Sequence, residues 1–190
     1  MKLFYNLPSP YARRVRVVAH ELALFDRLEL HECDPWADPA ELLAANPLAK
    51  VPALVTDDGI LIADSTAICL YLDGLSTGRR LVEGEAWRVM ARAALAQGLI
   101  DAAFTIVIER RRPANEQSRV WMERQRRAID RTLPRLTAGD RFDLGDITLS
   151  CGLAYLDLRL SEIPWRNNYP RLASWLDEIN RRASMRATAM

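Results

Sequence analysis

The sequence is poor in the residue types that build metal centres and disulfide frameworks. Its 190 residues include three cysteines and two histidines, and no two cysteines have the C-x-x-C spacing of a zinc or redox motif. Cys33, Cys69 and Cys151 are odd in number and widely separated, which argues against a disulfide-stabilised extracellular fold. We therefore expect no metal site and a reduced, cytoplasmic protein with its cysteines packed in the core.

Long hydrophobic runs and a strong charge of one sign are also lacking. The apolar run at residues 3–5 is too short for a signal peptide, and no segment is expected to be long enough to span a bilayer. The net charge is +1, so there is no overall attraction to nucleic acid or membrane. The charge is unevenly spread, with −5 in residues 1–75 and +6 in the rest, which is typical of solvated helix faces.

The first 75 residues alternate short apolar runs, which predict strands, with apolar residues at helical spacing. Ser9 is typical of a helix N-cap, and Pro10 of the first helical position. The expected elements are a strand at 2–5, a helix from 10, a strand at 28–31, a short helix capped by Asp38 and ending near 45, strands at 53–55 and 60–63, and a helix from 65 to about 73. This order is β-α-β-α-β-β-α.

The segment Asn46–Val55 contains a proline directly before a predicted strand. Because proline donates no hydrogen bond, it belongs at a strand's first residue or at a sheet edge. We interpret Val51-Pro52 as a cis bond that turns the chain into the strand. Such a turn leaves the backbone N–H and C=O of Val51 without partners in the sheet, and those groups are suited to an extended peptide.

Asp64-Ser65 stands directly before a helical pattern. The N–H groups at a helix start favour a carboxylate, although these two residues also suit a simple helix cap. Together with Val51-Pro52 they suggest a site for a short anionic peptide.

After a linker at residues 76–84 the pattern is entirely helical. The predicted helices cover residues 87–112, 116–133, 146–162 and 170–182. Asp143 and Asp146 have the spacing of a capping box before the third of these, and Phe142 and Ile147 that of a hydrophobic staple. The chain is thus divided into a domain at 1–75, the linker, and a helical domain at 85–190.

These features together resemble the glutathione S-transferase family, and within it a YibF-like bacterial subgroup. The resemblance lies in the order of elements and in four segments: Ser9–Arg13, Asn46–Val55, Leu99–Ala103 and Glu109–Ser118. It implies a thioredoxin-like N-terminal domain followed by an all-α C-terminal domain. It also implies glutathione as co-substrate, a homodimer and no metal.

The resemblance also implies a set of glutathione-binding residues. Val51 holds the cysteinyl backbone and Pro52 fixes that geometry, while Asp64 takes the γ-glutamyl ammonium and Ser65 its carboxylate. Lys50 approaches the glycyl carboxylate or is solvated. Asp101 reaches the γ-glutamyl end in the partner subunit or is an ordinary surface residue.

Ser9 is the implied catalytic hydroxyl, with Tyr11 and Tyr5 as rivals. A hydroxyl donor and a helix N-terminus both favour a thiolate. Ser9 is also simply a good N-cap, and Tyr5 also suits the core. The electrophile pocket is expected around Tyr11, Trp36, Phe104 and Thr105, which as mostly aromatic residues also suit packing.

The leading hypothesis is a transferase that activates the thiol of glutathione for attack on small electrophiles, as in detoxification. One alternative is glutathione-dependent reduction or thiol exchange, which uses a cysteine where this chain has Ser9. Another is a non-catalytic interaction protein that keeps the fold.

Overall fold

The computed structural model describes all 190 residues and contains two compact units. The first comprises Met1–Glu83 with Ala183–Met190, and the second comprises Gly84–Arg182. This division differs from the sequence-based one in assigning the last eight residues to the first unit.

The first unit is built on a four-stranded sheet in the order β2-β1-β3-β4. Its strands are β1 (Lys2–Tyr5), β2 (Glu29–Glu32), β3 (Ala53–Val55) and β4 (Leu61–Ala63). β1 pairs with β2 in parallel and with β3 antiparallel, and β3 pairs with β4 antiparallel. The predicted β-α-β-α-β-β-α order is confirmed, with β2 and β4 each beginning one residue later than expected.

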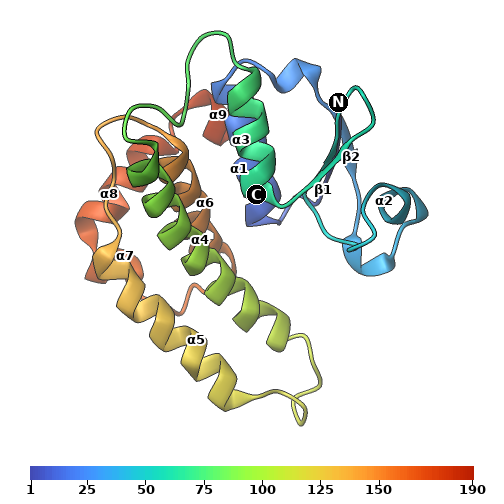
Figure 1. Cartoon of the computed structure of the whole chain (residues 1–190). Coiled ribbons are helices and arrows are strands. Elements are labelled where there is room, and N and C mark those ends of the chain that lie inside the picture. Colours follow the sequence, from blue (N-terminus) through green and yellow to red (C-terminus); the bar gives the residue numbers. More distant parts are fainter. The chain divides into compact units, whose positions relative to one another are not determined.

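Helices α1 (Pro10–Glu21) and α2 (Ala40–Ala45) connect the first three strands, and α3 (Ser65–Leu75) follows β4. Helices α1 and α3 lie side by side on one side of the sheet, and α2 lies on the other (Figure 1). The prediction that Asp38 caps α2 was wrong. Asp38 has φ 47° after the 3₁₀ turn Pro35–Ala37, and Pro39 precedes the first turn of α2.

The core of the first unit follows the alternation of side chains along the strands. Phe4 and Ala53 are opposite one another on β1 and β3 and pack with Leu42 of α2. Leu3 and Leu54 form the neighbouring pair and are fully buried. Because successive side chains point to opposite faces of a sheet, they face α1 and α3.

The short helix α9 (Ala183–Ala187) contacts α1. The buried guanidinium groups of Arg13 and Arg16 donate to backbone carbonyl oxygens of this segment, at 3.3 Å to Met185 and 3.4 Å to Ala187. The Ser184 hydroxyl donates to Glu21 at 2.6 Å. Polar contacts therefore join the C-terminal segment to α1.

The second unit is entirely helical. It contains α4 (Ala86–Glu109), α5 (Arg119–Thr132), α6 (Leu144–Arg159), α7 (Trp165–Asn168) and α8 (Pro170–Ile179). The predicted helices are present with shifted ends, and α7 was missed. Pro113 and Pro134 lie just beyond α4 and α5, as expected of residues that cannot continue a helix.

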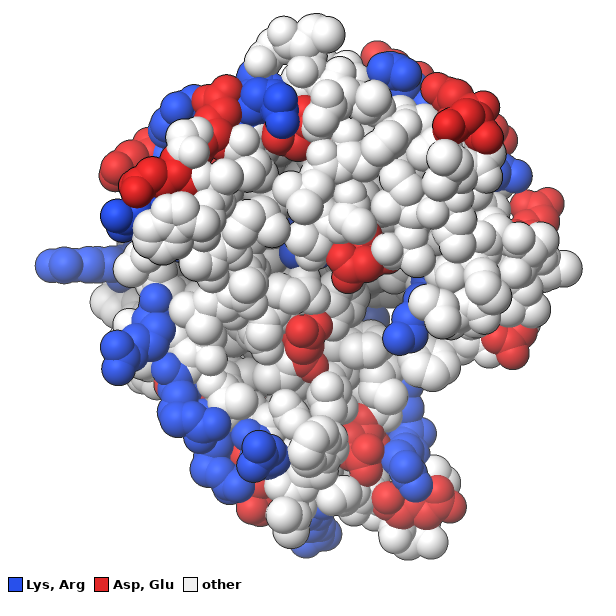
Figure 2. Space-filling view, viewed as in Figure 1, with Lys and Arg blue, Asp and Glu red and all other residues white.

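Most of the basic excess of the second unit lies on exposed helix surface. Figure 2 shows Lys and Arg side chains gathered over α5, whose exposed arginines are Arg119, Arg124, Arg127 and Arg131. Several basic residues form i,i+4 ion pairs, such as Arg126 with Asp130 at 3.0 Å. These contacts agree with the interpretation of the charge as a solvated helix face.

The capping box before α6 is confirmed. Asp143 accepts hydrogen bonds from the N–H groups of Gly145 and Asp146, at 2.8 and 3.1 Å, and Asp146 accepts one from the N–H of Asp143. Arg92 of α4 donates to both carboxylates. The start of the buried helix α6 is thereby connected to α4.

One helix is long and apolar enough to span a membrane, so the expectation that no such segment exists was wrong. Helix α4 has 24 residues and an 18-residue window of mean hydropathy 1.5. It also makes the most extensive helix contacts of the unit, with α6 and α5. A core helix of a helical bundle meets the same criteria, so the length is weak evidence for membrane insertion.

Candidate functional site

The candidate site lies at one edge of the sheet. Ala53 at the start of β3 pairs with Phe4 near the end of β1 and with Ala63 at the end of β4. The chain therefore leaves β1 and β4 at the edge where it enters β3. The predicted site segments that adjoin these strand ends are Ser9, Val51-Pro52 and Asp64-Ser65.

Ser9 begins α1 as predicted. Its backbone is extended, and its hydroxyl oxygen accepts a hydrogen bond from the Ala12 N–H at 3.2 Å, with Pro10 at the first helical position. As an acceptor, the hydroxyl still has its own hydrogen to donate. Ser9 thus combines a free O–H donor with the positive end of a helix.

The Val51-Pro52 bond is cis, as predicted. Neither the N–H nor the C=O of Val51 takes part in a backbone hydrogen bond, since β3 pairing begins at Ala53. Asn46 holds the preceding loop, with its side-chain amide donating to the Lys50 carbonyl at 2.9 Å and accepting from the Leu48 N–H at 3.1 Å. The unpaired backbone of Val51 is therefore presented from a fixed loop.

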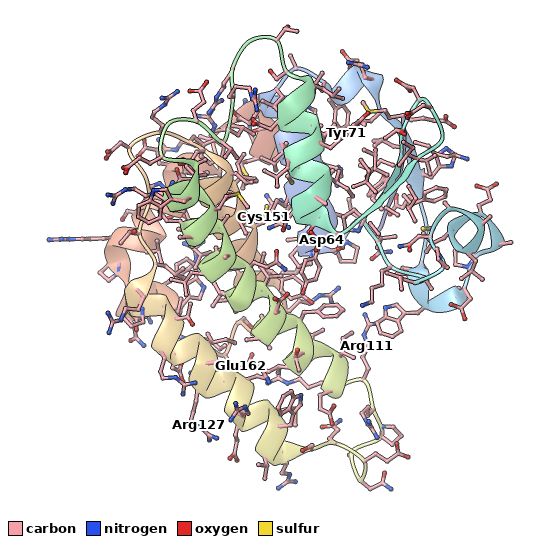
Figure 3. All side chains as sticks on the ribbon, in the orientation of Figure 1. Asp64, Tyr71, Arg111, Arg127, Cys151 and Glu162 are labelled. Carbon is pink, nitrogen blue, oxygen red and sulfur yellow. The ribbon has the colours of Figure 1, made fainter.

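Asp64 is the N-cap of α3 and has φ 84°. Its carboxylate accepts from the N–H groups of Thr66 and Ala67, at 2.8 and 3.1 Å, and Figure 3 shows it at the start of α3. The N–H of Ser65 takes part in no backbone hydrogen bond. Helix α3 thus offers an unused N–H beside the Ser65 hydroxyl, next to an exposed carboxylate.

Sequence reasoning missed the residue that lies behind Ser65. The guanidinium of Arg14 on α1 donates to the hydroxyl oxygens of Ser65 and, at 3.0 Å, of Thr66. Arg14 is 1% exposed. The signal was a charged residue at a position on the buried face of a predicted helix, where charge is costly unless it is paired or hydrogen-bonded.

Of the two rival hydroxyls, Tyr5 is engaged elsewhere. Its hydroxyl donates to Glu32 at 3.2 Å, and its ring lies 5.0 Å from the Arg16 guanidinium. Burial and the Glu32 carboxylate raise the pKa of Tyr5, which makes it a poorer acid. Tyr11 lies in the first turn of α1 and is half-buried.

Two further predicted residues belong to the first unit. Lys50 is exposed and directly precedes Val51. Trp36 is 59% exposed in the turn after β2. Because β2 runs parallel to β1, this turn follows the strand end at the same edge as Ser9.

The remaining predicted residues, Asp101, Phe104 and Thr105, lie on α4 in the second unit. Asp101 is exposed and accepts a hydrogen bond from Gln97 at 2.8 Å, while its carbonyl oxygen accepts from the Thr105 hydroxyl at 2.7 Å. These residues thus share one helix face. Their suggested roles remain predictions.

The cysteines are separate from one another and form no disulfide. Cys69 and Cys151 are buried and Cys33 is half-buried, and burial raises the pKa of Cys33. No group of three or more potential ligands of the His, Cys, Asp and Glu types is placed to hold a metal ion.

Comparison with known proteins identifies the family. Residues 8–75 match the model of the glutathione S-transferase N-terminal domain, and residues 119–178 that of the C-terminal domain. The uncharacterised GST-like protein YibF of Escherichia coli is 30% identical over 99% of this chain and 98% of its own.

Solved structures agree with this result. A glutathione transferase family member from Pseudomonas fluorescens Pf-5, with bound glutathione, superposes with a TM-score of 0.93 at 38% identity, covering 98% of this chain and 97% of that one. A second structure from that organism, with bound S-(propanoic acid)-glutathione, gives 0.89 at 36%, covering 99% and 98%. The chain belongs to the glutathione S-transferase family.

Proposed function

We propose that this protein is a glutathione transferase in which Ser9 activates the thiol of glutathione for attack on small electrophiles. The observation that carries the proposal is the meeting of three features at one edge of the sheet. These are a serine hydroxyl at a helix start, the unpaired backbone of Val51, and an acidic cap next to Ser65. The glutathione bound in a relative of similar fold supports it.

In this proposal, glutathione binds as a short extended strand. Its cysteinyl N–H and C=O pair with the backbone of Val51, in the manner of β-strand addition. The γ-glutamyl ammonium binds the exposed Asp64 carboxylate, and the γ-glutamyl carboxylate accepts from the N–H and hydroxyl of Ser65. Lys50 attracts the glycyl carboxylate through its ammonium, which is a weak contribution at an exposed position.

The orientation of the bound tripeptide directs its sulfur toward Ser9. A cysteine thiol has a pKa of about 8.5 and is mostly protonated near neutrality. Donation from the Ser9 O–H and the partial positive charge at the start of α1 both lower that pKa. A charge-assisted hydrogen bond worth about 1.4 kcal/mol raises the thiolate fraction tenfold.

The chemical step then forms a carbon–sulfur bond. The thiol proton leaves to solvent, and the thiolate donates an electron pair to an electrophilic carbon. In a substitution the leaving group departs with its bonding pair, and in an addition the product carbanion takes a proton from water. We assign the electrophile to the part of the first unit around Tyr11 and Trp36, with detoxification as the biological role.

The proposal extends to the state and place of the protein. We propose a cytoplasmic homodimer, as first inferred from the resemblance and from the free cysteines. In it, Asp101 of one subunit reaches the γ-glutamyl ammonium held by the other. Its exposed carboxylate on α4 suits that role.

Thiol exchange is less well supported than transfer. A mixed disulfide with glutathione requires an accessible protein thiolate, and Ser9 occupies the helix start where a thiol is needed. Cys33, which directly follows β2, has a pKa that is raised by burial. A glutathione adduct on Cys33 during turnover, seen by mass spectrometry, would favour exchange instead.

The test combines binding, turnover and the pKa of the bound thiol. Isothermal calorimetry should detect glutathione binding, and turnover of a chromogenic aryl halide should follow. In Ser9→Ala the pKa of bound glutathione, followed by thiolate absorbance, should rise by about one unit and turnover near neutrality should fall roughly tenfold. Ser9→Thr, which keeps a hydroxyl, should retain most activity.

Ser118→Ala is the matched control. Ser118 caps α5 by accepting from the Trp121 N–H at 3.3 Å, so this variant loses an equivalent cap, worth about 1 kcal/mol of stability, without touching the thiol. If wild type binds no glutathione, the proposal fails, and a single stoichiometric protein partner would then favour an interaction protein. If Ser9→Ala binds glutathione and leaves its thiol pKa unchanged, Ser9 is only a helix cap.

A further inference from the structure

We infer that Arg14 is a positioning residue for the γ-glutamyl carboxylate and acts through the Ser65 hydroxyl. The inference rests on the proposed glutathione site and extends it to a residue on a different helix. Arg14 lies on α1, yet its guanidinium donates to both hydroxyl oxygens in the first turn of α3, those of Ser65 and Thr66.

The start of α3 has few hydrogens available for a ligand. The Asp64 carboxylate already accepts from the N–H groups of Thr66 and Ala67. Of the side-chain and backbone donors at Ser65, the N–H and the hydroxyl hydrogen are left for a ligand. The direction of the N–H is fixed by the helix, whereas the O–H can rotate, so the second hydrogen bond to a carboxylate depends on the direction of the O–H group.

Arg14 determines the direction of the Ser65 O–H group. A hydroxyl has one hydrogen and two acceptor lone pairs. Because a guanidinium only donates and stays protonated in proteins, the Ser65 oxygen is the acceptor in the contact with Arg14. Its hydrogen is then directed away from Arg14, which makes Ser65 a donor toward the ligand.

The positive charge of Arg14 also favours the γ-glutamyl carboxylate electrostatically. Arg14 is 1% exposed and Ser65 is 3% exposed, so the cation lies one hydroxyl group behind the position proposed for the carboxylate. In such a low-dielectric setting a charge acts more strongly than in water. The same contacts also join α1, which carries Ser9, to α3. The experiment must therefore distinguish an effect on the bound carboxylate from stabilisation of the contact between these helices.

The experiment is a thermodynamic cycle in which one change is made in the protein and one in the ligand. Glutathione is compared with 4-aminobutanoyl-cysteinyl-glycine, which lacks only the γ-glutamyl carboxylate, by calorimetry on wild type and Arg14→Met. In wild type, loss of the carboxylate should weaken binding about 10- to 100-fold, the range of a hydrogen bond to a charged group. In Arg14→Met, glutathione should bind about tenfold more weakly, and loss of the carboxylate should cost threefold or less.

Arg16→Met is the matched control. Arg16 is on the same helix and is 7% exposed, but it donates to Ala187 and lies over Tyr5. Its removal should leave the effect of the carboxylate unchanged. Arg14→Lys keeps the cation without the planar fork and should recover part of the effect; if Arg14→Met does not fold, Arg14→Lys and Arg14→Gln replace it.

The outcomes separate the inference from the proposed function. If wild type and Arg14→Met lose the same factor on removal of the carboxylate, Arg14 is structural and the inference is overturned, while the glutathione site stands. If wild type binds neither ligand, it is the proposed function that fails. A selective loss in Arg14→Met supports both.

Discussion

The substitution Asp146→Ala tests whether satisfied donors, rather than net charge, stabilise the start of α6. Asp146 is 1% exposed. One carboxylate oxygen accepts from Arg92 at 2.9 Å and from the Gly139 N–H at 2.8 Å, and the other accepts from the Asp143 N–H at 3.4 Å. Alanine removes both acceptor oxygens with their three hydrogen bonds and leaves Asp143 as the carboxylate that still pairs with Arg92.

The magnitude follows from these contacts. Loss of the bond to Arg92 costs about 1.5–3 kcal/mol, and an unsatisfied N–H at Gly139 adds about 1 kcal/mol. The longer bond to Asp143 contributes a few tenths, so the free energy of unfolding should fall by about 3–4 kcal/mol.

The pKa of Asp146 indicates which part of the interaction matters. Burial raises this pKa, and the hydrogen bonds from Gly139 and Arg92 offset only part of that rise. Ionisation of the Asp146 carboxyl is therefore less favourable in the folded state than in the unfolded chain, although pairing with Asp146 and Asp143 raises the pKa of Arg92. Asp146→Asn, which keeps an acceptor oxygen, should lose about half as much as Asp146→Ala.

The assay is reversible urea unfolding followed by circular dichroism. Asp130→Ala is the control, since it removes an aspartate from an exposed i,i+4 pair with Arg126 and should cost about 0.5 kcal/mol or less. An equal loss in Asp146→Asn and Asp146→Ala would refute the reasoning, because the charge would then account for the stability. A loss in Asp146→Ala no larger than that of the control would refute the importance of the network altogether.

Three further predictions concern the first unit. Burial and Arg16 lower the pKa of His20, so the folded state favours its neutral form. Its contribution to stability is present above about pH 6.5 and is lost as the pH falls through the lowered pKa of the folded state. His20→Phe, which keeps the stacking on Phe25 at 3.7 Å, should therefore show a smaller drop in urea midpoint from pH 7 to 5, and equal drops would contradict this. Tyr5→Phe should leave the pKa of bound glutathione unchanged, because the Tyr5 hydroxyl donates to Glu32; a rise like that of Ser9→Ala would make Tyr5 the activating group. Deletion of Ala183–Met190 should lower the melting temperature measured by near-ultraviolet circular dichroism, since Arg13 and Arg16 lose their carbonyl acceptors, and an unchanged transition would show that the segment does not stabilise α1.

Local signals in the sequence predicted the starts of two helices and the cis bond before β3. Ser9-Pro10 begins α1, the bond before Pro52 is cis, and Asp143 with Asp146 forms the capping box. Each of these depends on residues a few positions apart, so short-range geometry decides them. The Asp38 cap failed because a preceding 3₁₀ turn, itself capped by Asp34, changed the local backbone, and a turn of that kind leaves little mark on hydrophobic periodicity.

The features that sequence reasoning missed depend on contacts between distant residues. Arg14 meets Ser65 across 51 positions, and Arg13 meets Met185 across 172. In a helical pattern an arginine predicts a solvent-exposed position, because a buried guanidinium without hydrogen-bond partners is costly. Its partners here are hydroxyl oxygens and backbone carbonyls, which no charge pattern reveals. The same reason explains why residues 183–190 were assigned to the helical domain. Their contacts with α1 include two backbone acceptors, for Arg13 and Arg16, whose positions are set by the fold and not by residue type. A charged residue on the apolar face of a predicted helix is thus better treated as evidence of an unseen polar partner than as an exception to the pattern, and at Arg14 that partner is the serine on which the proposed γ-glutamyl site depends.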